Sequence, residues 1–206
     1  MNTTMLWYTT RATGIVTLVL LTVTMVLGLA TTNRARARGW PGFAQQELHR
    51  RISILTVVFL GLHVVTSVLD TFVHIGWWAT LVPFTSPYDR VWVAVGTVAC
   101  DLLLAVFVSS LLRARLRPGT WKAIHWLAYA SWPVALVHTF GMGTDAGEEW
   151  VIALGIACGL AVLIALGWRL RTTALHGEAL RGVRLHQVVP GTRLAPPRHL
   201  TRSGRS

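Results

Sequence analysis

The sequence predicts an all-α integral membrane protein, a bundle of about five transmembrane helices. Of its 206 residues, 53% are hydrophobic and only 13% are charged, which is far from the composition of a soluble domain. The charges are also segregated, because long apolar runs carry almost none of them and short connectors carry nearly all. Hydrocarbon imposes this pattern, since a helix satisfies its own backbone hydrogen bonds while its side chains must match lipid.

Five segments have about the 17–25 apolar residues that a helix needs to cross a hydrocarbon core of about 30 Å. They cover residues 14–30, 52–70, 91–112, 121–140 and 150–170. We therefore expect residues 1–170 to form the membrane domain. Residues 171–206 are basic and contain glycine and proline, and we expect them to form a disordered cytoplasmic tail. The aromatic, proline-broken stretch 75–88 is expected to lie in the outer membrane interface.

The basic residues predict the orientation in the membrane. Five arginines lie between the first and second spans, three arginines and a lysine lie between the third and fourth, and eight arginines lie from residue 169 onward. The connector after the second span has Arg90 as its only arginine or lysine, and the connector after the fourth span has none. The positive-inside rule then gives an N-terminus outside and a C-terminus in the cytoplasm. The same placement explains the net charge of +11 without nucleic acid as a partner.

Four histidines are the candidate ligands for a redox or metal centre. His49 and His63 lie 14 residues apart at the start of and within the second span, and His125 and His138 lie 13 residues apart in the fourth. Both spans run from inside to outside, so His49 and His125 share an inner layer and His63 and His138 an outer one. At 1.5 Å per residue the two layers are about 20 Å apart. A histidine within a membrane span indicates function by default.

The layer separation decides which kind of site is possible. The ligands of a tetrahedral zinc ion must all lie within a few Å of it, which histidines about 20 Å apart cannot do. Two stacked sites, each bridged by one histidine from each span, suit the geometry of a bis-histidine haem between helices. Trp132 lies between the layers and is a candidate for the electron path between them.

The helical phase favours one histidine pair more than the other. At 100° per residue, 14 residues leave His49 and His63 about 40° apart on one face of a helix. Thirteen residues leave His125 and His138 about 140° apart, so a regular helix would not align them. Pro133 lies between them and is expected to alter the local winding.

These residues resemble a known family. The stretch 48–51 (Leu-His-Arg-Arg) with His63, and the stretch 121–129 (Trp-Lys-Ala-Ile-His-Trp-Leu-Ala-Tyr) with Pro133 and His138, resemble the ferric reductase-like transmembrane domain. That family includes ferric reductases, the membrane half of NADPH oxidases and the haem-binding membrane subunit of a bacterial methionine sulfoxide reductase system. The two histidine spacings, in matched order, are the most specific features of the resemblance.

The resemblance covers about residues 7–150 and implies that the membrane domain binds haem. It implies two b-type haems whose iron is held by two axial pairs, His49/His125 and His63/His138. The reductases and oxidases of the family continue into flavin and nicotinamide domains, whereas about 35 residues follow the last span here. We therefore expect a separate flavin reductase or a membrane quinol to supply the electrons.

The expected function is electron transfer from a cytoplasmic or membrane donor to an acceptor at the outer face of a bacterial plasma membrane. The acceptor would be ferric iron or an extracytoplasmic redox protein, and the chain would be the electron-transfer component of an oxidoreductase system, with no catalytic residue of its own. The alternative is a metal or small-solute transporter whose histidines bind the ion. Against it, the sequence shows no repeated halves with broken helices. A third possibility is a non-catalytic assembly subunit.

Overall fold

The computed structural model describes residues 3–32, 41–71, 73–142, 145 and 147–188, and every regular element among them is a helix. This confirms the predicted all-α class. The elements are α1 (Thr3–Thr32), α2 (Gly42–Leu69), the short 3-10 helix η1 (Trp77–Thr80), α3 (Arg90–Leu111), α4 (Pro118–His125), α5 (Leu127–Gly141) and α6 (Glu149–Val188).

Four of these helices are long and apolar enough to cross a membrane. Their apolar parts cover Thr4–Ala30, Gly42–Leu69, Arg90–Leu111 and Glu149–Ala174. They correspond to four of the five predicted spans, and they confirm that the chain is a multi-pass membrane protein. Many of their large apolar side chains are exposed, as lipid-facing positions should be.

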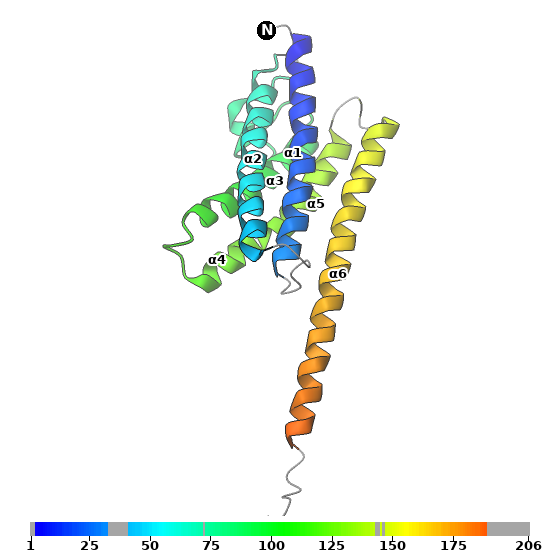
Figure 1. Cartoon of the computed structure of the whole chain (residues 1–206). Coiled ribbons are helices and arrows are strands. Elements are labelled where there is room, and N and C mark those ends of the chain that lie inside the picture. Colours follow the sequence, from blue (N-terminus) through cyan, green and yellow to red (C-terminus); the bar gives the residue numbers. More distant parts are fainter. Residues whose placement is uncertain (1–2, 33–40, 72, 143–144, 146, 189–206) are drawn as a thin grey trace, which may run out of the picture.

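The fourth predicted span, residues 121–140, differs from the expectation of one continuous helix. It is divided into α4, of eight residues, and α5, of 15 residues, which meet at Trp126. At 1.5 Å per residue, α5 alone is about 22 Å long and is shorter than a typical hydrocarbon core. Figure 1 shows α4 leading into α5 with a change of direction.

Hydrogen bonds of the 3-10 type explain the division of this span. The amide of Trp126 donates to the oxygen of Ala123 at 3.2 Å as well as to that of Lys122 at 3.1 Å, and the amide of Tyr129 donates to the oxygen of Trp126 at 3.0 Å. Bonds of three-residue spacing tighten the chain to about three residues per turn. Pro133 lies inside α5 without ending it, so the irregularity falls seven residues earlier in the chain than the sequence suggested.

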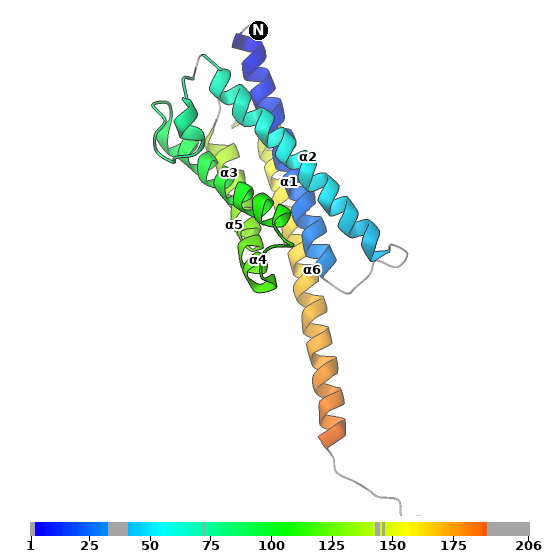
Figure 2. The same cartoon turned by 90° about the vertical axis from the view of Figure 1, so that its left-hand side faces the viewer.

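The helices are arranged as two closely packed pairs, α1 with α2 and α3 with α5. Helix α1 also packs against α5 and α6, and therefore joins the two pairs (Figures 1 and 2). Threonine and glycine recur along α1, and small residues of this kind let membrane helices approach closely. The hydroxyls of Thr24 in α1 and Thr56 in α2 lie 3.3 Å apart across one such contact.

The main buried core lies where α1, α5 and α6 meet. Its buried members are Leu21, Met25, Leu29, Trp132, Cys158 and Val162. The indole Nε1 of Trp132 donates a hydrogen bond of 3.0 Å to the Thr22 hydroxyl, so the only polar atom of this large side chain has a partner. Cys158 is a free, buried thiol that packs in this core as a small hydrophobic side chain.

The segment between α2 and α3 is attached to the bundle by a small second core. Ile75 and Ala79 are buried against Val93 of α3, and the hydroxyl of Thr97 donates to the oxygen of Ala79 at 2.6 Å. The large side chains of the segment are exposed, among them Trp77, Trp78, Leu81 and Phe84. The combination suits the predicted interfacial segment, since one side is held by protein and aromatic rings cover the other.

Helix α6 continues well beyond its membrane span to Val188, and it extends past the rest of the bundle in both views (Figures 1 and 2). The sequence predicted a disordered tail from residue 171. Residues 171–188 are rich in Ala, Leu and Arg, and they extend a helix that is already formed, so no new nucleus is required. The rest of the predicted tail, residues 189–206, lies outside the described residues.

The Trp132–Thr22 hydrogen bond gives a test of the core. Thr22→Val should leave a buried indole N–H without a partner and lower the free energy of unfolding by about 1–3 kcal/mol. Thr13→Val is the matched control, because the buried Thr13 hydroxyl bonds only to carbonyls of its own helix. Thermal unfolding of the detergent-solubilised protein measures both. Equal melting temperatures for the two variants would contradict this account.

Candidate functional site

His63 of α2 packs against α1, where its ring forms one hydrogen bond and lies in the space left by a glycine. Its Nδ1 lies 2.9 Å from the backbone oxygen of Thr10. A carbonyl only accepts, so Nδ1 carries the proton and Nε2 is left as a lone-pair donor. A methyl group on Gly14 would lie 2.9 Å from the imidazole Cε1, so the ring reaches the carbonyl only because residue 14 has no side chain.

His138 of α5 is held against α3 in the same way. Its Nδ1 lies 2.9 Å from the backbone oxygen of Trp92, and a methyl group on Gly96 would lie 2.5 Å from its Cε1. In both cases the glycine follows the accepting residue by four positions. A helix carbonyl has a second lone pair beyond the one that bonds the amide four residues on, and the glycine exposes it to the histidine.

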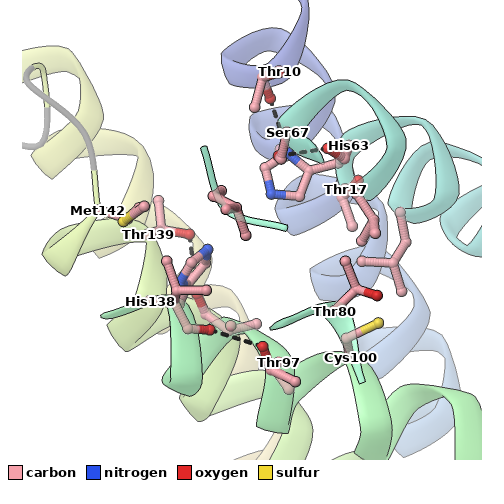
Figure 3. A pocket seen from close by; sticks show the side chains of 18 of the residues that line it. Thr10, Thr17, His63, Ser67, Thr80, Thr97, Cys100, His138, Thr139 and Met142 are labelled. Atoms are coloured by element: carbon pink, nitrogen blue, oxygen red, sulfur yellow. Dashed lines mark hydrogen bonds between the residues drawn. The ribbon is translucent and has the colours of Figure 1, made fainter. Parts of the chain in front are cut away.

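The two outer histidines face one another across a cavity. Their ring centres are 6.5 Å apart and their planes are inclined by 74°. The cavity lies between the two helix pairs, and Figure 3 shows His63 and His138 on opposite walls of it. The structure therefore brings together the outer pair that the sequence predicted.

His49 lies against α1 near the other end of α2. The ring contacts Gly28, where an added methyl group would lie 3.4 Å from Cε1, and the backbone of Thr24 interacts with it at longer range. Thr24 and Gly28 repeat the four-residue spacing seen at His63 and His138. The Nδ1 atom of His49 is buried and forms no hydrogen bond of good geometry.

His125 is the last residue of α4, directly before the tightened turn. For His125, the pairing with His49 in an inner layer stays a prediction from the sequence. Its ring stacks on Trp121, with centres 5.0 Å apart and planes inclined by 24°. Its Nδ1 is buried without a hydrogen bond.

The tightened turn also changes the angular relation between His125 and His138 from that of a regular helix. Each residue wound at 120° instead of 100° turns the chain by about 20° more. Residues wound in this way between His125 and His138 reduce the angular mismatch of about 140° that regular winding predicts. The change has the sign that would bring the two histidines toward one face, and the bonds of three-residue spacing at Trp126 supply part of the difference of about 140°.

Trp132 lies at a depth between the two pairs. Its partner Thr22 stands on α1 between Gly14, which contacts His63, and Gly28, which contacts His49. Those two glycines are separated by about 21 Å along the helix. The indole belongs to the core between α1, α5 and α6.

Arg11 and Asp70 line the outer cavity. The Nη1 of Arg11 donates to the oxygen of Met142 at 2.8 Å, and its other terminal nitrogen forms an ion pair with Asp145. Its charge acts on both His63 and His138. Arg11 therefore connects the outer end of α1 to the chain that follows α5, beside the outer histidine pair.

The glycines and carbonyls that contact the histidine rings were not predicted, although the sequence contains a spacing that indicates the glycines. Gly14 and Gly28 are 14 residues apart, the same spacing as His49 and His63. Because α1 and α2 run antiparallel, each glycine meets one histidine. Among the described residues no group of three or more His, Cys, Asp or Glu side chains is suited to hold one metal ion.

The fold and the site define a class of protein: a helical membrane bundle in which two buried histidines from different helices face one another across a cavity. The chain belongs to the family described as ferric reductase like transmembrane component, whose match covers residues 13–136. The matched range includes His49, His63 and His125, and His138 lies just beyond it. No curated protein and no solved structure matches the chain. Membrane domains of this family generally bind haem and have a role in electron transfer.

The ion pair beside the outer site can be tested by a double-mutant cycle. Arg11 and Asp145 are mostly buried, with 17% and 19% of their side chains exposed. Arg11→Gln and Asp145→Asn should each lower the free energy of unfolding by about 1–3 kcal/mol, and the double variant should lose less than the sum of the two. Arg51→Gln, which breaks an exposed pair with Glu47, is the control and should leave thermal unfolding unchanged. Additive losses at Arg11 and Asp145 would show that the pair does not act as a unit.

Proposed function

We propose that this protein carries electrons across a bacterial plasma membrane through two b-type haems, an inner one between His49 and His125 and an outer one between His63 and His138. The observation that supports this proposal most directly is the outer pair. Two buried imidazoles from different helices face one another across a cavity. The N-terminus is placed outside and the C-terminus in the cytoplasm by the distribution of basic residues.

The ring separation at the outer pair suits two ligands on one metal. Metal–imidazole bonds are about 2 Å long, so two nitrogens on opposite sides of one ion are about 4 Å apart. Each nitrogen lies about 1 Å from the centre of its ring, so the ring centres would be about 6 Å apart. The observed value of 6.5 Å fits this arrangement. The steep inclination of the planes is also compatible, since both rings need only contain the axis through the metal.

The hydrogen bonds at Nδ1 have the role that such bonds have in metalloproteins. They select the tautomer with a free Nε2, fix the plane of the ring and make the ligand nitrogen more basic. Thr10 and Trp92 supply these bonds from the main chain, which no side-chain rotation can remove. The chain itself thus preorganises both outer ligands.

A haem held by the two histidines of a pair would supply one-electron exchange. The remaining residues would shape the route through the membrane. Trp132, buried at an intermediate depth, provides an aromatic ring between the inner and outer layers. Arg11 would stabilise negative charge at the outer layer, where the electron leaves.

The donor and acceptor follow from the two faces. On the cytoplasmic face a separate flavin reductase, or a quinol from the membrane, would reduce the inner haem. At the outer face the acceptor would be ferric iron or an extracytoplasmic redox protein. In this scheme the protein is the electron-transfer component of an oxidoreductase system.

The deciding experiment is a reduced-minus-oxidised spectrum together with a pyridine haemochrome assay on protein purified from haem-replete cells. We expect b-type bands and two haems per chain. Protein without haem that instead drives metal-dependent uptake into liposomes would establish the transporter alternative. Protein with neither property would leave the assembly role.

Single histidine variants test the assignment of ligands. His63→Ala and His138→Ala should each remove the same one of the two haems, and His49→Ala and His125→Ala should each remove the other. His74→Ala is the control, because His74 lies in the segment between α2 and α3 and should leave both haems in place. Haem per chain and the difference spectrum give the answer. Retention of both haems in any of the four variants would contradict the assignment of that residue.

The glycine that contacts His138 offers a subtler test. Gly96→Ala places a methyl group where the imidazole lies, so the ring must leave its hydrogen bond to Trp92. Loss of such a supporting bond typically weakens metal binding on the order of 10-fold or more. Gly61→Ala is the matched control, because nothing lies within 4 Å of the added methyl group. Retention of outer haem during dilution or competition with an apoprotein measures the effect, and equal retention in both variants would contradict the role given to Gly96.

A further inference from the structure

Three side chains form a stack that leads from the surface to the inner histidine pair. The guanidinium carbon of Arg113 lies 4.4 Å from the centre of the Trp121 ring. On Trp121 lies the imidazole of His125, nearly parallel at 5.0 Å. Arg113 directly follows the end of α3, whereas Trp121 and His125 are one turn apart on α4. The stack therefore connects two elements at the end of the bundle where the inner pair lies.

His125 differs from the other three histidines in that its ring stacks on a tryptophan, while its Nδ1, like that of His49, is buried without a hydrogen bond. His63 and His138 donate to backbone oxygens, and His49 lies beside the Thr24 backbone and Gly28. The Nδ1 of His125 is buried without a hydrogen bond. The face of the indole is thus the main contact that can fix the imidazole plane.

The position of His125 makes such a constraint necessary. It lies at the junction of α4 and α5, where the hydrogen-bond pattern is irregular, and α4 has only eight residues. A backbone of this kind orients a side chain less rigidly than the middle of a long helix does. Two aromatic rings stacked face to face restrict rotation about the side-chain bonds.

Arg113 adds a charge to this arrangement. Its guanidinium lies over the indole in a cation–π contact, and its charge also acts on His125. A positive charge near a metal centre favours the reduced form, because reduction adds an electron. Removal of the charge should therefore lower the reduction potential of that centre.

We propose that Trp121 is the positioning residue for the inner ligand His125 and that Arg113, whose guanidinium lies over the indole, raises the reduction potential of the inner centre. The proposal rests on the proposed function, because it needs a haem between His49 and His125. It assigns to the stack the role that main-chain hydrogen bonds have at the outer pair.

Variants of Trp121 test the positioning role. Trp121→Leu removes the ring, whereas Trp121→Phe keeps an aromatic face but loses the indole N–H, which is buried and has no hydrogen bond. The readout is electron paramagnetic resonance of the oxidised protein, because the largest g value of a bis-histidine haem depends on the angle between its two ligand planes. Trp121→Leu should shift the signal of one haem, Trp121→Phe should restore it, and the signal of the haem lost in His63→Ala should not move.

Variants of Arg113 test the electrostatic role without touching the aromatic contact. Arg113→Gln should lower the midpoint potential of the inner haem in a redox titration and leave the outer haem unchanged. Arg115→Gln is the matched control, since Arg115 belongs to the same exposed connector and has no ring contact among the described residues. It should have a smaller effect than Arg113→Gln.

The outcomes separate the failure of this proposal from the failure of the proposed function. Wild-type protein with two haems, and with an inner signal and potential that neither Trp121→Leu nor Arg113→Gln alters, would overturn the role of the stack alone. Wild-type protein without an inner haem would overturn both proposals. If Trp121→Leu does not fold, Trp121→Phe and Arg113→Gln decide, because unchanged inner potential in Arg113→Gln contradicts the proposal.

Discussion

The structure depends on one repeated contact, a histidine ring that packs on a helix where a glycine uncovers a carbonyl. At Thr10 and Gly14, and again at Trp92 and Gly96, an oxygen and a glycine four residues later receive an imidazole from a neighbouring helix. Thr24 and Gly28 repeat the spacing beside His49. This contact is favourable in a membrane, because the acceptor is a carbonyl that already belongs to a helix. No unpaired polar group is added to the hydrocarbon region. It also fixes helix register, because each histidine can meet only the position that lacks a side chain.

That register determines where the cavity can be. Gly14 with His63 and Gly28 with His49 align α1 and α2 along most of their lengths, and Gly96 with His138 aligns α3 and α5. Each pair of helices then presents its histidines from one wall. The cavity lies between the pairs, so its two walls are stiff units joined by α1. A flat macrocycle between two such walls would meet ligands that are already oriented, and little ordering would remain to oppose its binding.

Much of this arrangement could be predicted from the sequence, because hydrocarbon leaves few alternatives. The apolar runs predicted four spans at nearly the observed positions, and the histidine spacing predicted the facing of His63 and His138. The parts that could not be predicted depend on local hydrogen bonding. The turn at Trp126 has no glycine or proline beside it, so its sequence does not indicate a break in the helix. Pro133 was expected to alter the winding, yet α5 continues through it. The helical extension of α6 to Val188 was missed because composition favoured disorder, whereas continuation of an existing helix decided the outcome.

The two layers are held by different means, and the difference follows from depth. The outer histidines lie against the long helices α1 and α3, whose regular backbone can supply a carbonyl at a fixed place. The inner His125 lies at a helix junction near the basic connectors, where no such regular backbone partner bonds its Nδ1. An aromatic ring and an arginine suit that location, since both are favourable at a membrane boundary, where the guanidinium reaches water and the indole packs against apolar groups. Charge is also placed accordingly: a cation lies close to each layer, Arg11 at the outer pair and Arg113 at the inner one. If each pair holds a haem as proposed, the two centres would share one ligand chemistry and differ in their neighbours: a buried ion pair beside the outer histidines, and an indole with a guanidinium beside His125.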